Sequence, residues 1–113
     1  MTATQQDFEM RKGDTKILEF TVKDSDGTVV DITGSTSKWE AARGGRTATT
    51  KNIAKSGISP SDPTNGKFQV TIDPADTSSL AAGKYFHEAE LTDSSSRVIT
   101  VAEGQMTLVE DLV

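Results

Sequence analysis

The amino-acid sequence predicts an all-β fold, a β-sandwich of about seven to nine short strands with one helical turn near residues 74–80. Two observations lead to this prediction. Apolar and polar side chains alternate over short stretches such as 18–22 and 68–72, which is the pattern of strands with one buried face and one exposed face. Turn-forming residues separate these stretches, and the sequence indicates no long helix. The length of 113 residues fits a single domain of this class.

The first half of the chain predicts an arm followed by four strands. Residues 1–6 are polar and predict a flexible N-terminal arm, whereas residues 7–113 predict one folded domain. The expected strands cover residues 7–11, 15–24, 28–32 and 37–42. The tight turn Ser25-Asp26-Gly27 joins the second of these to the third. Trp39, the only tryptophan, lies on the fourth strand and predicts a ring in the core.

The second half predicts further strands and the helical turn. We expect strands at residues 50–55, 67–73, 85–92, 97–103 and 105–110, the first of them a weak edge strand. The prolines in 59–66 predict a turn-rich connection without regular strand pairing. Asp73-Pro74 is typical of a helix start, with aspartate as the N-cap and proline at the first helical position. Gly104 predicts a bulge or bend between the last two strands.

The stretch 80–93 predicts the corner around which the fold is built. Leu80, Gly83 and Tyr85 precede an alternating strand, and a tyrosine in this place can direct its hydroxyl to upstream backbone while its ring fills the core. This corner favours an immunoglobulin-like β-sandwich. We expect Trp39 to pack near Tyr85, Phe20 and Phe68. The residues expected to determine the fold are Leu80, Gly83, Tyr85, Trp39, Phe20, Phe68 and His87.

His87 is the only histidine of the chain. It lies two residues after Tyr85 on the same face of the predicted strand, where antibody domains place a core cysteine. We therefore expect a core-facing histidine that is hydrogen-bonded or partly hydrated. A catalytic or metal-binding histidine needs partner residues, and no spacing in the sequence supplies them.

The charge balance is acidic, with 12 basic against 17 acidic side chains and a net charge of −5. A nucleic-acid partner needs a basic surface, so we expect none. The charges are unevenly distributed: residues 38–55 carry five basic side chains against one acidic, whereas residues 73–113 carry two basic against eight acidic. Either polar loops differ by chance, or the molecule has oppositely charged ends that dock copies or neighbours head to tail.

Two acidic patterns invite a metal-binding interpretation. Asp24-Ser25-Asp26-Gly27 begins like a calcium loop, but its glycine comes at the fourth position and its twelfth position is Ser35, so a hairpin turn is the better interpretation. Acids near Asp73, Asp76 and Asp93 leave a weak surface cation as an alternative. We predict no metal-binding residue.

The sequence offers no catalytic equipment. It has no cysteine and no G-x-S-x-G nucleophile motif. Glu88 and Glu90 share the outward face of a strand but lack a cleft that raises the pKa of one of them, and Gly44-Gly45 lacks the lysine of a phosphate loop. We therefore predict a protein that is not an enzyme, with no catalytic or cofactor-binding residue, no cofactor and no small-molecule substrate.

Membrane insertion is not indicated either. No apolar run approaches the roughly 20 residues that span a bilayer. The N-terminus lacks the basic start and apolar segment of a signal peptide. We expect no membrane partner and a protein that is used without export.

The predicted interface lies in the basic half of the chain. Arg43 and Arg46 flank two glycines, in a loop that is either an ordinary flexible loop or an arginine clamp on acidic residues of a neighbouring subunit. With Lys51 and Lys55 they form the interface that we predict.

Taken together, two long stretches resemble the immunoglobulin-like domains of tailed-phage and prophage virion proteins, among them the N-terminal domain of siphophage baseplate upper proteins. The resemblance covers about residues 13–113. It includes D-I-T-G before the tryptophan strand, the N-G-K-F strand, L-x-x-G-x-Y and an acidic tail. It is carried by GDTKILEFTVKDSDGTVVDITGSTSKWEA and NGKFQVTIDPADTSSLAAGKYFHEAELTDSSSRVITVAEGQMTLVED.

The resemblance implies a structural protein of the virion, with capsid or tail proteins and copies of itself as partners. Because baseplate examples continue into further domains whereas this sequence ends at Val113, we expect a small capsid decoration or accessory subunit. The alternatives are a tail, neck or baseplate component, and an adhesion module that binds a host glycan or receptor. For adhesion, Phe8 and Phe86 are the candidate exposed aromatic residues.

Overall fold

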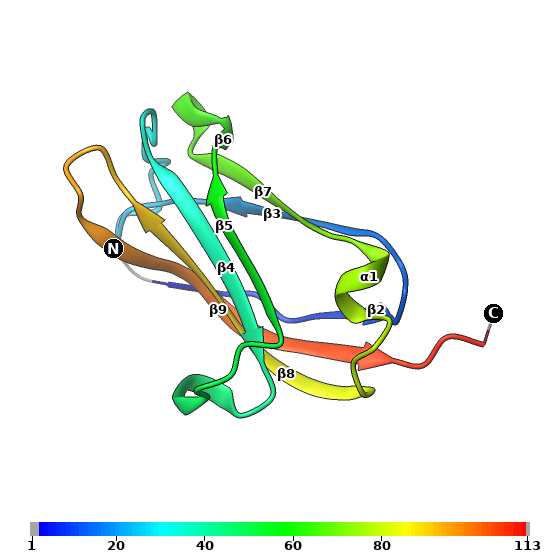
Figure 1. The fold of residues 1–113 in the computed structure, drawn as a ribbon. Coiled ribbons are helices and arrows are strands. Elements are labelled where there is room, and N and C mark those ends of the chain that lie inside the picture. Colours follow the sequence, from blue (N-terminus) through cyan, green and yellow to red (C-terminus); the bar gives the residue numbers. More distant parts are fainter. Residues whose placement is uncertain (1–2, 113) are drawn as a thin grey trace.

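Two β-sheets pack face to face in the computed structural model, which describes residues 3–112 (Figure 1). The large sheet has the strand order β1-β9-β8-β4-β5, with β2 also paired to β9, and the small sheet has the order β3-β7-β6. The strands are β1 (Thr4–Gln5), β2 (Phe8–Arg11), β3 (Lys16–Thr21), β4 (Thr36–Ala42), β5 (Ile53–Ile58), β6 (Pro60–Asp62), β7 (Lys67–Ile72), β8 (Gly83–Thr92) and β9 (Val98–Val109). Three single turns complete the fold: η1 (Gly45–Thr47), η2 (Pro63–Asn65) and α1 (Pro74–Thr77). The all-β sandwich prediction is confirmed.

The core lies between the two sheets and consists of the inward residues of their alternating strands. Phe20 and Phe68 stack with ring centroids 5.1 Å apart. Trp39 shares this core with them and with Tyr85, although its own ring contact is with His87, at 5.8 Å between centroids. Five of the residues expected to determine the fold are buried, and Leu80 is partly buried against them. The buried five are Phe20, Trp39, Phe68, Tyr85 and His87.

The predicted tyrosine corner is present. The Tyr85 hydroxyl donates a hydrogen bond to the Ala81 carbonyl at 2.6 Å. Gly83 has a φ of 145°, and a Cβ added there would lie 2.5 Å from the Arg43 guanidinium. That guanidinium donates to the Ala82 carbonyl at 3.2 Å and lies 5.4 Å from the centre of the Tyr85 ring. Glycine is favoured here because other residues rarely adopt this backbone conformation, and a Cβ would also displace the Arg43 guanidinium.

The helical turn α1 follows β7 and contacts the turn between β2 and β3. As predicted, Asp73 is its N-cap and Pro74 its first residue, and the Asp76 carboxylate accepts the Asp73 N–H at 2.7 Å. Thr77 is fully buried, and its hydroxyl accepts the N–H of Gly13 at 2.9 Å. This bond fixes the turn between β2 and β3 against α1.

Three strand predictions need correction in the first and middle parts of the chain. Residues 28–32 form only the isolated bridge Lys23–Val29, flanked by two backbone hydrogen bonds between the same segments, and beyond it the Ile32 N–H donates to the Pro63 carbonyl. The expected strand 50–55 begins later, as β5. The proline-rich connection contains β6, which is compatible with Pro60 because an edge strand needs no donor on its open side.

The last two predicted strands are one strand, β9, and Gly104 marks no break in it. The register irregularity of the β8–β9 pair lies instead between Ala89 and Glu90. Gly104 is needed for another reason: a Cβ there would collide with the Gln6 carbonyl oxygen.

Part of the expected flexible arm is also a strand. Thr4 pairs with Ala102 and Phe8 pairs with Met106, so β1 and β2 keep one register along β9 and together form one interrupted parallel strand. Thr4 and Gln5 are therefore held by parallel pairing with the edge of β9, although they are polar. Residues 1–2 of the arm lie outside the described residues.

Candidate functional site

His87 connects the core to the interruption between β1 and β2. The Trp39 Nε1–H donates to His87 Nδ1 at 3.0 Å, and His87 Nε2 lies 2.6 Å from the Gln6 carbonyl oxygen. An indole N–H can only donate and a carbonyl can only accept, so these partners assign the proton of neutral His87 to Nε2. Burial lowers the pKa of His87 from 6.5, although the Gln6 carbonyl and the Asp7 carboxylate act in the opposite direction. The predicted core-facing histidine is confirmed.

The Asp7 side chain replaces a backbone acceptor where the pairing with β9 is interrupted between β1 and β2. The Gln105 N–H donates to Asp7 Oδ1 at 2.9 Å, and the Gln5 side-chain amide donates to the same oxygen at 2.8 Å. These bonds, the Gln105 N–H first, lower the pKa of Asp7. The Asp7 side chain thus supplies the acceptor for Gln105, while the Gln6 carbonyl is bonded by His87 beside Gly104.

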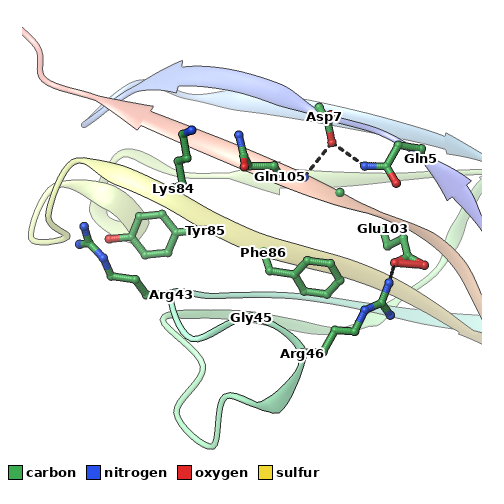
Figure 2. Close-up of a pocket in the computed structure, with 11 residues that line it drawn as sticks. Gln5, Asp7, Arg43, Gly45, Arg46, Lys84, Tyr85, Phe86, Glu103 and Gln105 are labelled. Atoms are coloured by element: carbon green, nitrogen blue, oxygen red, sulfur yellow. Dashed lines mark hydrogen bonds and ion pairs between the residues drawn. The ribbon is translucent and has the colours of Figure 1, made fainter.

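A groove of about 390 Å³ opens beside this interruption, between the β4–β5 loop and the outer face of β8 and β9 (Figure 2). Arg43 and Arg46 stand on the loop side, Phe86 lies on the floor, and Asp7 and Gln105 stand on the far side. The groove combines cationic, aromatic and hydrogen-bonding groups. Such a surface suits contact with another protein.

Arg46 reaches from the loop side over the floor of this groove. Its guanidinium lies 4.8 Å from the centre of the Phe86 ring, 3.7 Å from Glu88 and in ion-pair contact with Glu103. Glu88 is the cross-strand neighbour of both Glu40 and Glu103, so three carboxylates lie in one row across β4, β8 and β9. Arg46 offsets the repulsion within this row while its side chain stays 61% exposed.

The other predicted interface residues also contact their own chain, and the four do not form one surface. Arg43 braces the tyrosine corner, and Lys51 donates to the Ala48 carbonyl at 3.0 Å. Lys55 lies apart from them and pairs with Asp76 at 2.7 Å. The Asp76 hydrogen bond raises the pKa of Lys55. Burial alone would raise the pKa of Asp76, but Lys55 and the Asp73 N–H lower it.

The uneven charge distribution has an intramolecular explanation that neither sequence interpretation contained. The basic segment 38–55 lies on the acidic segment 73–103 of the same molecule. Lys38 pairs with Glu90 at 3.4 Å, Arg46 with Glu88 and Glu103, and Lys55 with Asp73 and Asp76. The opposite charges therefore stabilise the fold, at least in part, instead of marking two opposite ends.

The acidic patterns are parts of turns. Asp24 Oδ1 accepts the N–H groups of Asp26 and Thr28, which confirms the predicted hairpin turn. Asp93 accepts two N–H groups in the β8–β9 hairpin and lies at the other end of β8 from Asp76, so the structure does not bring these acids together. Among residues 3–112, no group of three His, Cys, Asp or Glu side chains is arranged to hold a metal ion. In the same part of the chain, no helix is long and apolar enough to cross a membrane.

The two candidate exposed aromatic residues are covered. Phe8 packs edge-on against His87 with centroids 5.1 Å apart, and the Lys16 amine lies 5.9 Å from its centre. Phe86 lies beneath Arg46. Both rings are partly buried, so they offer a glycan less exposed aromatic surface than the sequence suggested.

Comparison with protein families gives the deciding observation: the model of the BppU N-terminal domain matches residues 2–113. The chain belongs to this family. The family is the N-terminal domain of a phage baseplate upper protein. It identifies the chain as a structural domain of the phage tail or baseplate type, whose partners are other virion proteins.

Other comparisons add little. No curated protein sequence matches the chain. Among solved structures, the crystal structure of CopC from Methylosinus trichosporium OB3b is similar, with 12% sequence identity and a TM-score of 0.46 over 99% of this chain and 91% of that one. A likeness this weak supports no functional argument.

Proposed function

We propose that this chain is a non-enzymatic docking module of a phage baseplate, which attaches to neighbouring tail proteins and does not decorate the capsid. The single observation that carries the proposal is the family match over residues 2–113. The structure supports a docking role, because the groove presents the exposed Arg46 guanidinium beside an aromatic ring and hydrogen-bonding groups.

The docking surface that we propose is the groove beside the β4–β5 loop. Arg46 combines a fixed position over Phe86 with a side chain that is 61% exposed, so it can bind a carboxylate of a partner without first being ordered. Arg43, Lys51 and Lys84 lie on or near the same loop and add positive charge. The partner surface that fits places an acidic residue over the loop side of the groove, away from Asp7 and Glu103. Many identical copies in a symmetric baseplate then bind durably even where each contact is weak.

The first test is the location of the chain in the particle. Phage particles are separated into heads and tails, and the chain is quantified in each fraction by mass spectrometry. The proposal predicts the chain in the tail fraction. Its presence on heads would establish a decoration subunit instead, and its absence from both would favour the adhesion alternative, which a glycan array then examines.

The second test concerns the surface. We expect Arg46→Glu to weaken binding to purified tails about tenfold, because a charge-assisted contact becomes a repulsion. Arg97→Glu is the matched control, since Arg97 is an exposed basic residue with an acidic partner in the β8–β9 hairpin, at the other end of β8 from Phe86. Equal binding of both variants at every salt concentration would place the docking surface elsewhere.

A further inference from the structure

The edge strands of the two sheets differ in how well they are protected against pairing with another chain. The edge strand β5 has Gly57 in a left-handed conformation with φ of 65°, and its pairing with β4 is irregular between Ser37 and Trp39. The edge strand β6 has three residues and contains Pro60. The edge of β9 is covered by β1 and β2 from Ala102 to Val109. Kinks, proline and short length are the usual means of blocking an edge.

The strands β1 and β2 form the outer edge of the large sheet beside β9, and they have only two and four residues. The last edge strand, β3, is neither kinked nor that short, and it contains no proline. Its six residues, Lys16–Thr21, pair in one unbroken register with β7, and in the described part of the chain β7 is its one strand partner. Its charged residues, Lys16 and Glu19, are its protective features, and neither kinks nor shortens the strand. In the seven-stranded immunoglobulin arrangement, the N-terminal strand lies beside this second strand. Here the N-terminal strand pairs with β9, so the place beside β3 is vacant.

Backbone geometry shows which groups of β3 face this vacant place. The Val22 N–H donates to Gly66 O in the same register as the β3–β7 pair. Hydrogen-bonded residues alternate along an antiparallel pair, so Leu18 and Phe20 also bond toward β7. The N–H and C=O groups of Ile17, Glu19 and Thr21 therefore point away from β7, toward the open edge.

The side chains on this edge describe what could pair with it. Ile17 is 58% exposed on the outer face, and Glu19 contacts Lys67 at 3.3 Å and Gln69 at 3.4 Å across the sheet. Pairing with β3 of a second copy, centred on the strand, sets Glu19 against Glu19 or against Ile17, which is unfavourable. A different strand can place an apolar residue opposite Ile17 and a basic residue or threonine opposite Glu19.

There is also room beside the start of this edge. A hollow of about 260 Å³ lies between β2 and the first residues of β3. Val109 of β9 lines it together with residues of β2, of the following turn and of β3: Glu9, Met10, Arg11, Asp14, Thr15 and Lys16. An incoming chain can continue past Lys16 into this hollow without displacing an element of the fold.

We propose that the β3 edge accepts an extended segment of another tail protein by β-strand addition, with an apolar residue opposite Ile17 and a basic residue or threonine opposite Glu19. This inference rests on the proposed function and adds a second contact to it, on the side of the molecule away from β5. Main-chain hydrogen bonds supply the attachment, and the outward side chains of β3 select the partner.

The test measures binding of the purified full-length chain and its variants to purified tails assembled without it. Ile17→Lys places a charge on the edge and should weaken binding at least tenfold. Glu19→Pro removes an outward N–H that β7 does not use, and should weaken binding as much. Val98→Lys is the matched control, because Val98 is 59% exposed on β9, and should bind like the original chain. Circular dichroism verifies the fold of each variant, and the milder Ile17→Thr replaces any variant that fails to fold.

The outcomes separate the two proposals. If the original chain binds tails and the β3 variants bind equally well, strand addition is wrong and the proposed function stands. If the original chain does not bind tails, the proposed function fails and the inference falls with it. If the free chain dimerises and Ile17→Lys makes it monomeric, a second copy occupies the edge, and the assignment to another tail protein is overturned.

Discussion

The two open sides of the sandwich are closed by different kinds of interaction. On the β9 side, Trp39, His87 and the Gln6 carbonyl form a neutral, buried chain of hydrogen bonds that holds the N-terminal strand. On the β5 side, Lys55 and Asp76 form an ion pair whose side chains are 25% and 23% exposed. The buried hydrogen bonds stabilise the fold because breaking them would leave buried polar atoms without partners. The ion pair is weaker because solvent and salt screen its charges.

The difference also affects the edges. On the β5 side, both edge strands are protected, by Gly57 and by Pro60. On the β9 side, the strand that could cover β3 is used to cover β9. The side that is held by buried hydrogen bonds therefore leaves the edge of β3 unpaired. The side that is held by the ion pair lies between β5 and β6, whose edges are protected.

The largest expected effect comes from removing the buried link. His87→Ala leaves the Trp39 indole N–H and the Gln6 carbonyl without their partner and opens a cavity, so we expect a loss of about 3–4 kcal/mol in the free energy of unfolding. Chemical denaturation measures it. Lys84→Ala, at an exposed position of the same strand, should change stability by less than about 0.5 kcal/mol. A loss below about 1 kcal/mol for His87→Ala would contradict the comparison.

Gly104→Ala should come next, with a loss of about 2 kcal/mol, because the new Cβ collides with the Gln6 carbonyl oxygen and pushes the N-terminal strand away. Gly27→Ala is a control for backbone conformation. It has open space around it and a φ of 83°, so it should lose about 1 kcal/mol from the left-handed backbone alone. Gly104 is not in the left-handed region, so its loss measures the collision alone. Thermal unfolding compares the two variants, and a loss for Gly104→Ala no larger than that for Gly27→Ala would contradict the collision.

The third expected effect is a decrease in stability at mildly acidic pH, caused by the lowered pKa of His87. Because its pKa is lower in the folded protein than in the unfolded chain, the unfolded chain binds the proton first as the pH falls. Stability is therefore full above about pH 6.5 and decreases below it, by at most about 1.4 kcal/mol per pH unit, until the folded-state pKa is reached. Asp7, the charged group that acts on His87, has a lowered pKa and contributes a loss only in more acidic solution.

Denaturation midpoints between pH 7.5 and 5 measure this slope. The His87→Ala variant should lack it in the same interval. An equal slope in both proteins would mean that another group titrates there.

The smallest effect is expected on the β5 side. Lys55→Met removes the ion pair with Asp76 but keeps most of the apolar stem, so we expect a loss of about 0.5–1 kcal/mol that shrinks in 1 M salt. Lys38→Met, which removes the more exposed pair with Glu90, should be nearly neutral. A loss above 2 kcal/mol for Lys55→Met would mean that the charged closure matches the neutral one.

Local patterns were sufficient to predict much of the fold. Alternation identified the inward residues of β3, β7 and β8, and the tyrosine corner and the Asp73-Pro74 helix start depend on neighbours in sequence. The link from His87 to Gln6 depends instead on the register of β1 along β9, which joins residues that lie 98 positions apart. No local pattern contains that register, and the pairing of His87 with Gly104 becomes visible only in the structure.

The candidate site was harder to predict for the same reason. The sequence identified Arg43 and Arg46 as basic loop residues, but their contacts with Ala82, Glu88 and Glu103 arise only when the β4–β5 loop folds over β8 and β9. The vacant place beside β3 depends on which sheet the N-terminal strand joins, and the alternation of residues 7–11 fits either sheet.

Amide hydrogen exchange in the free protein, measured residue by residue by NMR, tests most directly the claim that the N-terminal strand covers β9 and leaves β3 open. The account predicts slow exchange at Leu18, Phe20 and Val22, and fast exchange at Ile17, Glu19 and Thr21. Uniformly slow exchange along residues 17–22 would show that a strand already covers the edge of β3 and would contradict the account.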